Sequence, residues 1–152
     1  LWVSDNQIAI RYDNFEMTSR LVDGKYPDYS QIIPAEFKTT AKFPVDVMVN
    51  KIKAAGLFTT TGVNAVSFDL NVSDKTIGIS STSTQTGEHS SQIDVEITGD
   101  ENSILLNHRY VLDGLQQMDG EVEFSVNSGD APCMFKSKGD DSYLYIVMPV
   151  RQ

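Results

Sequence analysis

The residues best suited to chemistry in this sequence are two histidines and one cysteine. His89 and His108 lie in different predicted elements, and neither has the spacing to Cys133 that a zinc site requires. The sequence also lacks a phosphate-binding glycine loop, a nucleophile elbow and the paired-histidine zinc motif. We therefore predict no catalytic residue, no bound metal and no cofactor.

The remaining reactive side chains fit structural roles. Asp119 and the pair Asp140-Asp141 stand beside glycines, where a short acidic side chain favours turns by bonding to nearby backbone. Cys133 lies in a predicted strand, which is typical of a packed core thiol. An enzyme with an unrecognised carboxylate site is a less favoured alternative.

Composition limits the partners that the chain could bind. The formal net charge is −9, and 40% of the 152 residues are hydrophobic, enough for a real core. Phosphate contact favours clustered lysine and arginine, so we expect no tight grip on DNA, although a protein can surround DNA without gripping it. A single cysteine cannot form an internal disulfide, which fits a reducing cytoplasm. No apolar run reaches the roughly 20 residues that a membrane-spanning helix needs.

The first part of the chain is predicted to contain strands followed by a connector. Residues 7–12 show the alternation of a strand and have a turn pair on either side, and 15–22 follow as another strand. We therefore predict that 1–22 form a meander without a helix. Residues 23–35 contain two prolines, which fix φ and bias the preceding residues to extended conformations. We interpret 23–35 as an extended connector between domains. Because the chain opens as if within a strand, we expect a fragment of a longer protein.

The next segment is predicted to fold as a strand, a helix and three strands. A strand near 36–43 precedes Pro44, which we place at the first helical position. One apolar face at helical spacing follows, formed by Val45, Met48, Val49, Ile52 and Ala55. Strands are then predicted near 63–71, 75–81 and 89–97.

The same order of elements recurs in the last third of the chain. Asn107 is a good N-cap for a helix over 108–118, with a buried stripe of Val111, Leu115 and Met118. Strands are predicted at 104–106 and near 121–127, 131–138 and 142–149. The segment 36–150 is therefore predicted to be a β-α-β-β-β unit written twice, an α+β fold with two sheets and both helices on one side.

Both faces of the final predicted strand are apolar. One face is formed by Tyr143, Tyr145, Val147 and Pro149, and the other by Leu144, Ile146, Met148 and Val150. One face can enter the core, whereas the other needs a partner surface, for which methionine is well suited. The alternative is a central strand that is buried on both sides.

Two segments resemble the bacterial DNA polymerase III beta subunit, the sliding clamp family. Residues 25–29, Lys-Tyr-Pro-Asp-Tyr, followed by Ile-Ile-Pro at 32–34, are similar to the family's connector. The ending from Ile146 to Arg151 is similar to the family's closing pattern of two apolar residues, Met-Pro, an apolar residue and Arg. The resemblance identifies residues 1–22 as the last strands of the middle domain, 23–35 as the connector and 36–152 as the C-terminal domain.

The resemblance implies a non-catalytic processivity factor for DNA replication. In this family, two subunits of three similar domains each close a ring around duplex DNA, with helices facing the hole. The ring tethers the polymerase III alpha subunit, the clamp loader and other proteins that carry a clamp-binding motif. Residues facing the DNA channel would be Lys51, Lys53 and Arg109, on helices that are neutral to slightly positive. Without the resemblance, surface helices that happen to carry basic residues are an equal alternative.

The resemblance also implies two protein-binding sites. The partner-peptide groove would contain Pro27, Gln31, Ile32, Ile146, Met148, Pro149, Val150 and Arg151. The dimer seam would contain Leu57, Phe58 and Glu88. Gln31 departs from a commonly basic position, and polar residues largely replace acidic ones around the seam. The rival hypothesis is a stand-alone β-rich interaction module unrelated to replication.

Overall fold

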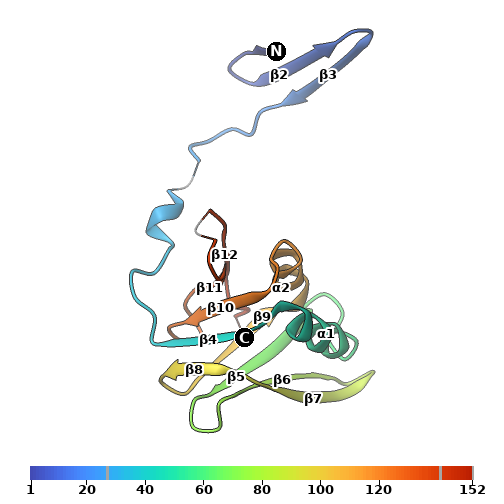
Figure 1. Cartoon of the computed structure of the whole chain (residues 1–152). Coiled ribbons are helices and arrows are strands. Elements are labelled where there is room, and N and C mark those ends of the chain that lie inside the picture. Colours follow the sequence, from blue (N-terminus) through green and yellow to red (C-terminus); the bar gives the residue numbers. More distant parts are fainter. Residues whose placement is uncertain (27, 141, 152) are drawn as a thin grey trace. The chain divides into compact units, whose positions relative to one another are not determined.

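The computed structural model describes residues 1–26, 28–140 and 142–151 (Figure 1). The chain divides into two compact units, residues 1–30 and residues 31–152, which are described separately. Among the described residues, no helix combines the length and the apolar character that crossing a bilayer requires.

The first unit is a small antiparallel sheet. Its strands β1 (Trp2–Val3), β2 (Gln7–Tyr12) and β3 (Phe15–Arg20) pair in chain order, so the predicted meander is confirmed. Asp13 turns the β2–β3 hairpin with a φ of 50°, a left-handed conformation that aspartate tolerates. Most of its apolar side chains, such as Trp2 and Phe15, are exposed. The predicted connector is not wholly extended, because Tyr29–Gln31 form the 3-10 helix η1.

Within its described residues, the second unit contains two sheets and two helices. In chain order its elements are β4 (Thr39–Pro44), α1 (Val45–Gly56), β5 (Ala65–Asn71), β6 (Thr76–Ser83), β7 (Gly87–Asp94), β8 (Glu96–Gly99), β9 (Asn102–Asn107), α2 (His108–Leu115), β10 (Glu121–Val126), β11 (Cys133–Ser137) and β12 (Leu144–Val147). The strand orders are β12-β11-β10-β4-β8 and β7-β6-β5-β9. The predicted α+β class, with both helices on one side of the sheets, is confirmed (Figure 1).

The two β-α-β-β-β units exchange their first strands. Strand β4 of the first β-α-β-β-β repeat pairs with β10 of the second repeat. Strand β9 of the second repeat pairs with β5 of the first, and both pairings are antiparallel. Neither sheet can therefore form from one unit alone. The exchange also places α1 and α2 in contact with each other.

The structure corrects two predicted element boundaries. The strand predicted at 89–97 is two strands, β7 and β8, which belong to different sheets and meet at the buried Val95. Inward-facing residues continue through this change of sheet, so the sequence alternation conceals it. Helix α2 ends at Leu115 rather than 118, where the N–H of Met118 donates to the Leu115 carbonyl in a tighter turn.

Pro44 caps helix α1 from outside instead of occupying its first position. Its φ of −67° and ψ of 131° are extended, and the helix begins at Val45. The Val45 N–H, which has no partner within the helix, donates to the Gly120 carbonyl at 2.9 Å. The start of α1 is therefore tied to the turn that precedes β10.

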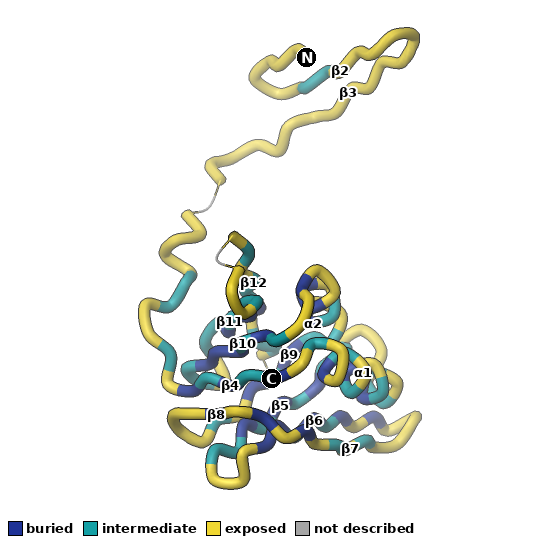
Figure 2. Tube along the Cα trace, viewed as in Figure 1, coloured by how far each residue is buried: buried dark blue, intermediate teal, exposed yellow. Residues whose placement is uncertain are grey.

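The core lies between the two sheets and beneath the helices (Figure 2). Phe124 is at its centre, stacked on Phe135 with ring centroids 4.5 Å apart and edge-on to Phe43 and Phe68. The predicted helix faces enter this core, including the fully buried Ile52. Aromatic pairs of this kind stabilise a core beyond the area that they bury.

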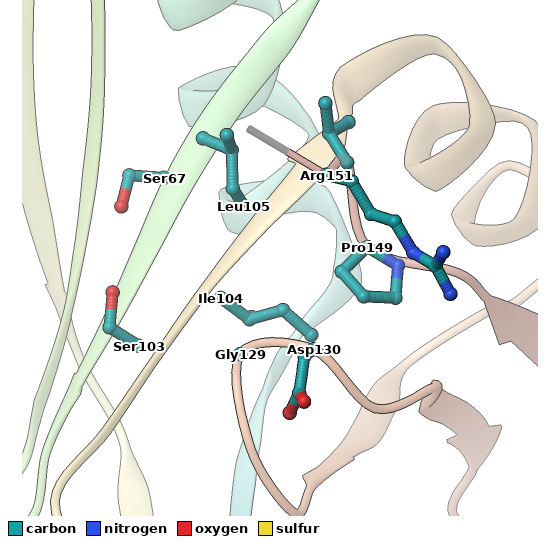
Figure 3. Close-up of a pocket in the computed structure, with 9 residues that line it drawn as sticks. Ser67, Ser103, Ile104, Leu105, Gly129, Asp130, Pro149 and Arg151 are labelled. Carbon is teal, nitrogen blue, oxygen red and sulfur yellow. The ribbon is translucent and has the colours of Figure 1, made fainter.

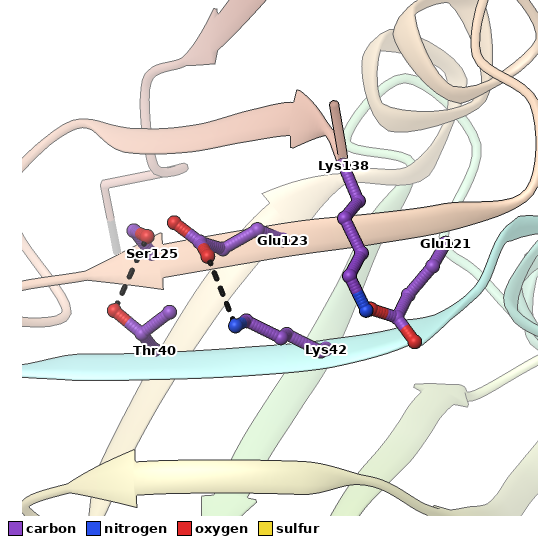
Figure 4. A network of polar contacts seen from close by, with 6 residues as sticks. All are labelled: Thr40, Lys42, Glu121, Glu123, Ser125 and Lys138. Carbon is purple, nitrogen blue, oxygen red and sulfur yellow. Dashed lines mark hydrogen bonds and ion pairs between the residues drawn. The ribbon is translucent and has the colours of Figure 1, made fainter. Parts of the chain in front are cut away.

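The outer face of the larger sheet is polar, as strand alternation requires (Figure 4). Lys42 Nζ on β4 lies 3.7 Å from Glu123 Oε2 on β10. Lys138 Nζ lies 2.6 Å from Glu121 Oε1. The hydrogen bond and charge of Glu121 raise the pKa of Lys138. Surface pairs like these contribute little to stability, so they mainly favour the observed strand register.

Candidate functional site

Strand β12 presents one face to the core and the other to solvent. Val147 is buried, and Tyr143 and Tyr145 pack against the core cluster. On the other face, Leu144 is 44% exposed and Met148, just after the strand, is 53% exposed. Because β12 is the outermost strand of its sheet, the prediction of one unpartnered apolar face is confirmed and the alternative of a central strand is wrong.

The inner face of β12 is held by helix α2. A Cβ at Gly114 of α2 would lie 2.2 Å from the ring of Tyr145, so only glycine allows this close approach. Burial, followed by the nearby Asp113, raises the pKa of Tyr145. Since the tyrosine ring is fixed against the helix, Leu144 and Ile146 are directed to the opposite face.

Beyond Val147, the chain crosses to the other sheet. The Val150 N–H donates to the Leu105 carbonyl at 2.8 Å, which places the tail on the free edge of β9. A hollow of about 650 Å³ lies beside it (Figure 3). Its lining consists of Ser67, Ser103, Ile104, Leu105, Gly129, Asp130, Pro149, Val150 and Arg151. Figure 3 shows Ser67 and Ser103 on the strand side, opposite Pro149 and Arg151.

A second hollow, of about 510 Å³, lies next to the same tail. It is lined by Thr60, Val63, Ala65, Ser67, Ser80, Ser81, Thr82, Leu105, Val150 and Arg151. Val150 and Arg151 border both hollows, so the tail separates them. Sequence reasoning missed Leu105, although its position between the buried Ile104 and Leu106 already predicts that it faces outward.

Opposite charges border the first hollow. The Ser128 hydroxyl donates to Asp130 at 2.6 Å and lowers the pKa of that carboxyl, with a smaller contribution from Arg151. An ionised aspartate and a guanidinium can together position polar groups of a ligand, while Pro149 and Val150 supply apolar contacts.

The connector residues lie apart from these two hollows. Gln31 and Ile32 are exposed, and neither borders either hollow, nor do Ile146 and Met148. Pro27 lies outside the described residues. Of the residues predicted for the groove, the structure therefore brings together Pro149, Val150 and Arg151.

The predicted seam residues lie in one region, where the end of α1 meets β7. Leu57 is 74% exposed, whereas Phe58 stacks on the ring of His89 with centroids 5.6 Å apart. Glu88 is exposed next to that histidine, on the outermost strand of the smaller sheet. The contribution of His89 could not be predicted, because a ring contact between distant segments leaves no local pattern.

The three predicted channel residues have different surroundings. Lys53 on α1 and Arg109 on α2 are exposed. Lys51 is half-buried and borders a third hollow between α1 and β7, together with Gln92 and Asp94. Lys53 and Arg109 are therefore the more accessible cations of the two helices.

In the described parts of the chain, no group of three or more histidine, cysteine or acidic side chains could hold a metal ion. Burial raises the pKa of the Cys133 thiol to about 12, so it is not a nucleophile at neutral pH.

Comparison with known proteins places these features in a family. A beta sliding clamp of Synechocystis is 27% identical over 152 residues, covering 99% of this chain and 39% of that protein. One from Staphylococcus aureus is 29% identical, covering 99% of this chain and 40% of its own length. The crystal structure of the Bacillus subtilis DNA polymerase sliding clamp matches with a TM-score of 0.83 at 28% identity, covering 99% of this chain and 40% of that one. The chain thus spans about two fifths of the length of these relatives.

The family assignment rests on most of the second unit. The model of the family described as "DNA polymerase III beta subunit, C-terminal domain" matches residues 30–151. This match covers both helices, both sheets and the tail on β9. The resemblance found in the sequence is confirmed, and the chain belongs to the DNA polymerase III beta subunit family, with residues 30–151 matching its C-terminal domain.

Proposed function

We propose that this chain is the C-terminal portion of a ring-shaped, homodimeric sliding clamp. The clamp surrounds duplex DNA in the cytoplasm and tethers the polymerase III alpha subunit, the clamp loader and other proteins with a clamp-binding motif. It catalyses no reaction itself. Family membership and relatives that are called beta sliding clamps support this proposal.

The observation that carries the proposal is the exposed apolar end of the chain. The outer side chains of Leu144 and Met148 have no cover within the described residues that would remove them from water. The tail beside them is fixed to β9 by the Val150–Leu105 hydrogen bond. A fixed apolar surface of this kind binds a short extended peptide by burying a few of its side chains.

The groove in this proposal has a tail side and a connector side. The tail side consists of Ile146, Met148, Pro149, Val150 and Arg151, and the connector side of Pro27, Gln31 and Ile32. A few buried anchors would give roughly micromolar affinity, which is about −8 kcal/mol. The middle domain of a complete subunit would supply a further wall, so the present chain alone should bind peptide weakly.

The test is fluorescence anisotropy of a labelled peptide of the Gln-x-x-Leu-Phe type. A full-length subunit should bind the peptide, and deletion of the last five residues should nearly abolish binding because the tail side of the groove is lost. The deletion variant should still dimerise, which controls for misfolding. If the full-length subunit ignores the peptide, or binds it equally well after the deletion, the proposed groove is wrong.

The proposed role with DNA depends on ring closure rather than on affinity. Exposed Lys53 and Arg109 make the helical face less repulsive to phosphates, but the chain carries a net charge of −9. We expect negligible binding of linear duplex by this chain at physiological salt. Submicromolar, salt-sensitive binding in an electrophoretic mobility assay would contradict this expectation.

A further inference from the structure

The loop between α1 and β5, residues 57–64, begins with the two apolar residues of the proposed seam. Leu57 and Phe58 follow the last helical residue directly. At the other end, the N–H groups of Val63 and Asn64 both donate to the Thr60 carbonyl, at 3.2 and 3.1 Å. This short, internally bonded loop depends on how its two ends are held.

One residue of the second β-α-β-β-β unit holds the far end of this loop. The backbone N–H of His108 donates to the Asn64 carbonyl at 2.9 Å, and the ring Nδ1 of His108 lies 2.9 Å from the same oxygen. Because a carbonyl oxygen only accepts, Nδ1 must carry the hydrogen in this arrangement. Asn64 itself has a φ of 52°, a left-handed conformation that asparagine tolerates better than most residues.

The same histidine ring also contacts the near end of the loop. A Cβ at Gly56 would lie 2.9 Å from both Cδ2 and Nε2 of His108, so the ring fills the space beside the last residue of α1. Hydroxyls hold the neighbouring carbonyls, from Ser81 to Ala55 at 2.7 Å and from Thr59 to Gly56 at 3.0 Å. The His108 ring therefore lies against one end of the loop and is bonded to the other.

We propose that His108 is a positioning residue for the dimer seam, which fixes both ends of the 57–64 loop so that Leu57 and Phe58 are held ready for a partner subunit. The inference rests on the proposed function, since a seam exists only if the subunit dimerises. His108 is half-buried at the start of α2 and acts through the loop. Holding a contact residue in its bound orientation lowers the entropy that association must remove.

The test compares three substitutions of His108 in a full-length subunit by sedimentation equilibrium. H108A and H108Q should raise the dimer dissociation constant roughly three- to tenfold, the size expected for one lost intramolecular hydrogen bond. H108N should stay within about twofold of the unsubstituted protein, because the amide nitrogen of asparagine can take the place of Nδ1. T40A is the matched control, since it removes a side-chain contact to Ser125 on the outer sheet face, remote from the loop.

A double-mutant cycle with Gly56 tests the steric half of the inference. G56A alone should weaken the dimer, because its methyl group collides with the ring, and G56A combined with H108A should be less harmful than the sum of the two changes. Additive effects, or equal dissociation constants for H108N and H108Q, would overturn the proposed role of His108. If L57A weakens the dimer while H108A does not, only the role of His108 fails. If the unsubstituted full-length subunit stays monomeric, the proposed function as a homodimeric clamp is wrong as well.

Discussion

Strands β7 and β12 are both outermost strands of their sheets, yet they present different surfaces. Along β7, the exposed residues Glu88, Ser90 and Gln92 are polar, and the apolar contribution comes from Leu57 at the neighbouring end of α1. Strand β12 is half as long, and the exposed Leu144 within it and Met148 just after it are apolar.

This difference agrees with the two kinds of partner in the proposed function. An unpaired eight-residue edge offers a row of backbone groups, which a folded domain with its own edge strand can match. A short edge with apolar side chains and a fixed tail offers anchor sites, which a peptide can fill. The comparison can be tested by substitutions that should affect one surface and spare the other.

The largest expected effect comes from the core that both surfaces share. Phe124 contacts Phe43, Phe68 and Phe135 and is fully buried, so F124A should lower the free energy of unfolding by roughly 3–5 kcal/mol. Urea denaturation of the present chain measures this loss. If F124A lowers the free energy of unfolding by less than about 1 kcal/mol, strands β7 and β12 do not depend on a common core around Phe124.

The sequence predicted much of this architecture because hydrophobic periodicity reports which side of an element is buried. It correctly gave the buried faces of α1 and α2, the N-cap at Asn107, whose side chain accepts from the Arg109 N–H, and the unpartnered face of β12. Alternation carries no information about which sheet a strand joins. The exchange of β4 and β9 and the split at Val95 were therefore not predictable.

The candidate sites were predictable only where local pattern or family resemblance marked them. The apolar character of the tail exceeds what one core face needs, which marked it as a candidate surface, whereas its assignment to a groove came from the family resemblance. The contacts of His89 with Phe58 and of His108 with Asn64 and Gly56 join segments that are distant in sequence. Ring packing of this kind depends on the tertiary fold and leaves no signal in a single sequence.

The second prediction concerns the surface at β7. Replacing both Leu57 and Phe58 with alanine in a full-length subunit should weaken the dimer by about 2–4 kcal/mol, because apolar burial in the seam is lost. Peptide binding should be unchanged per folded subunit. Sedimentation velocity near the wild-type dissociation constant measures the first effect, and an unchanged mass there would count against the seam.

The third prediction is the reciprocal change at β12. M148A should cost on the order of 1–2 kcal/mol of peptide binding, because the exposed side chain of Met148 is one anchor among several. The dimer dissociation constant should be unaffected. Anisotropy titrations of M148A and of the Leu57/Phe58 double variant, run side by side, separate the surfaces. A loss of both functions in either protein would show that they are not independent.

The smallest expected effect comes from removing the charge of Glu88 on β7, and it tests whether charge holds this edge to its partner. Within β7, the exposed charges Glu88 and Asp94 are separated by uncharged residues, so the strand lacks a continuous row of carboxylates that a basic partner could match. An exposed single charge contributes little because water and salt screen it. E88Q should therefore change the dimer dissociation free energy by less than about 0.5 kcal/mol, and the dissociation constant should vary only weakly with ionic strength. Sedimentation equilibrium at low and high salt measures both quantities. A dimer that dissociates steeply with added salt, and that E88Q weakens well beyond this range, would show that charge rather than the apolar Leu57 region holds the β7 surface.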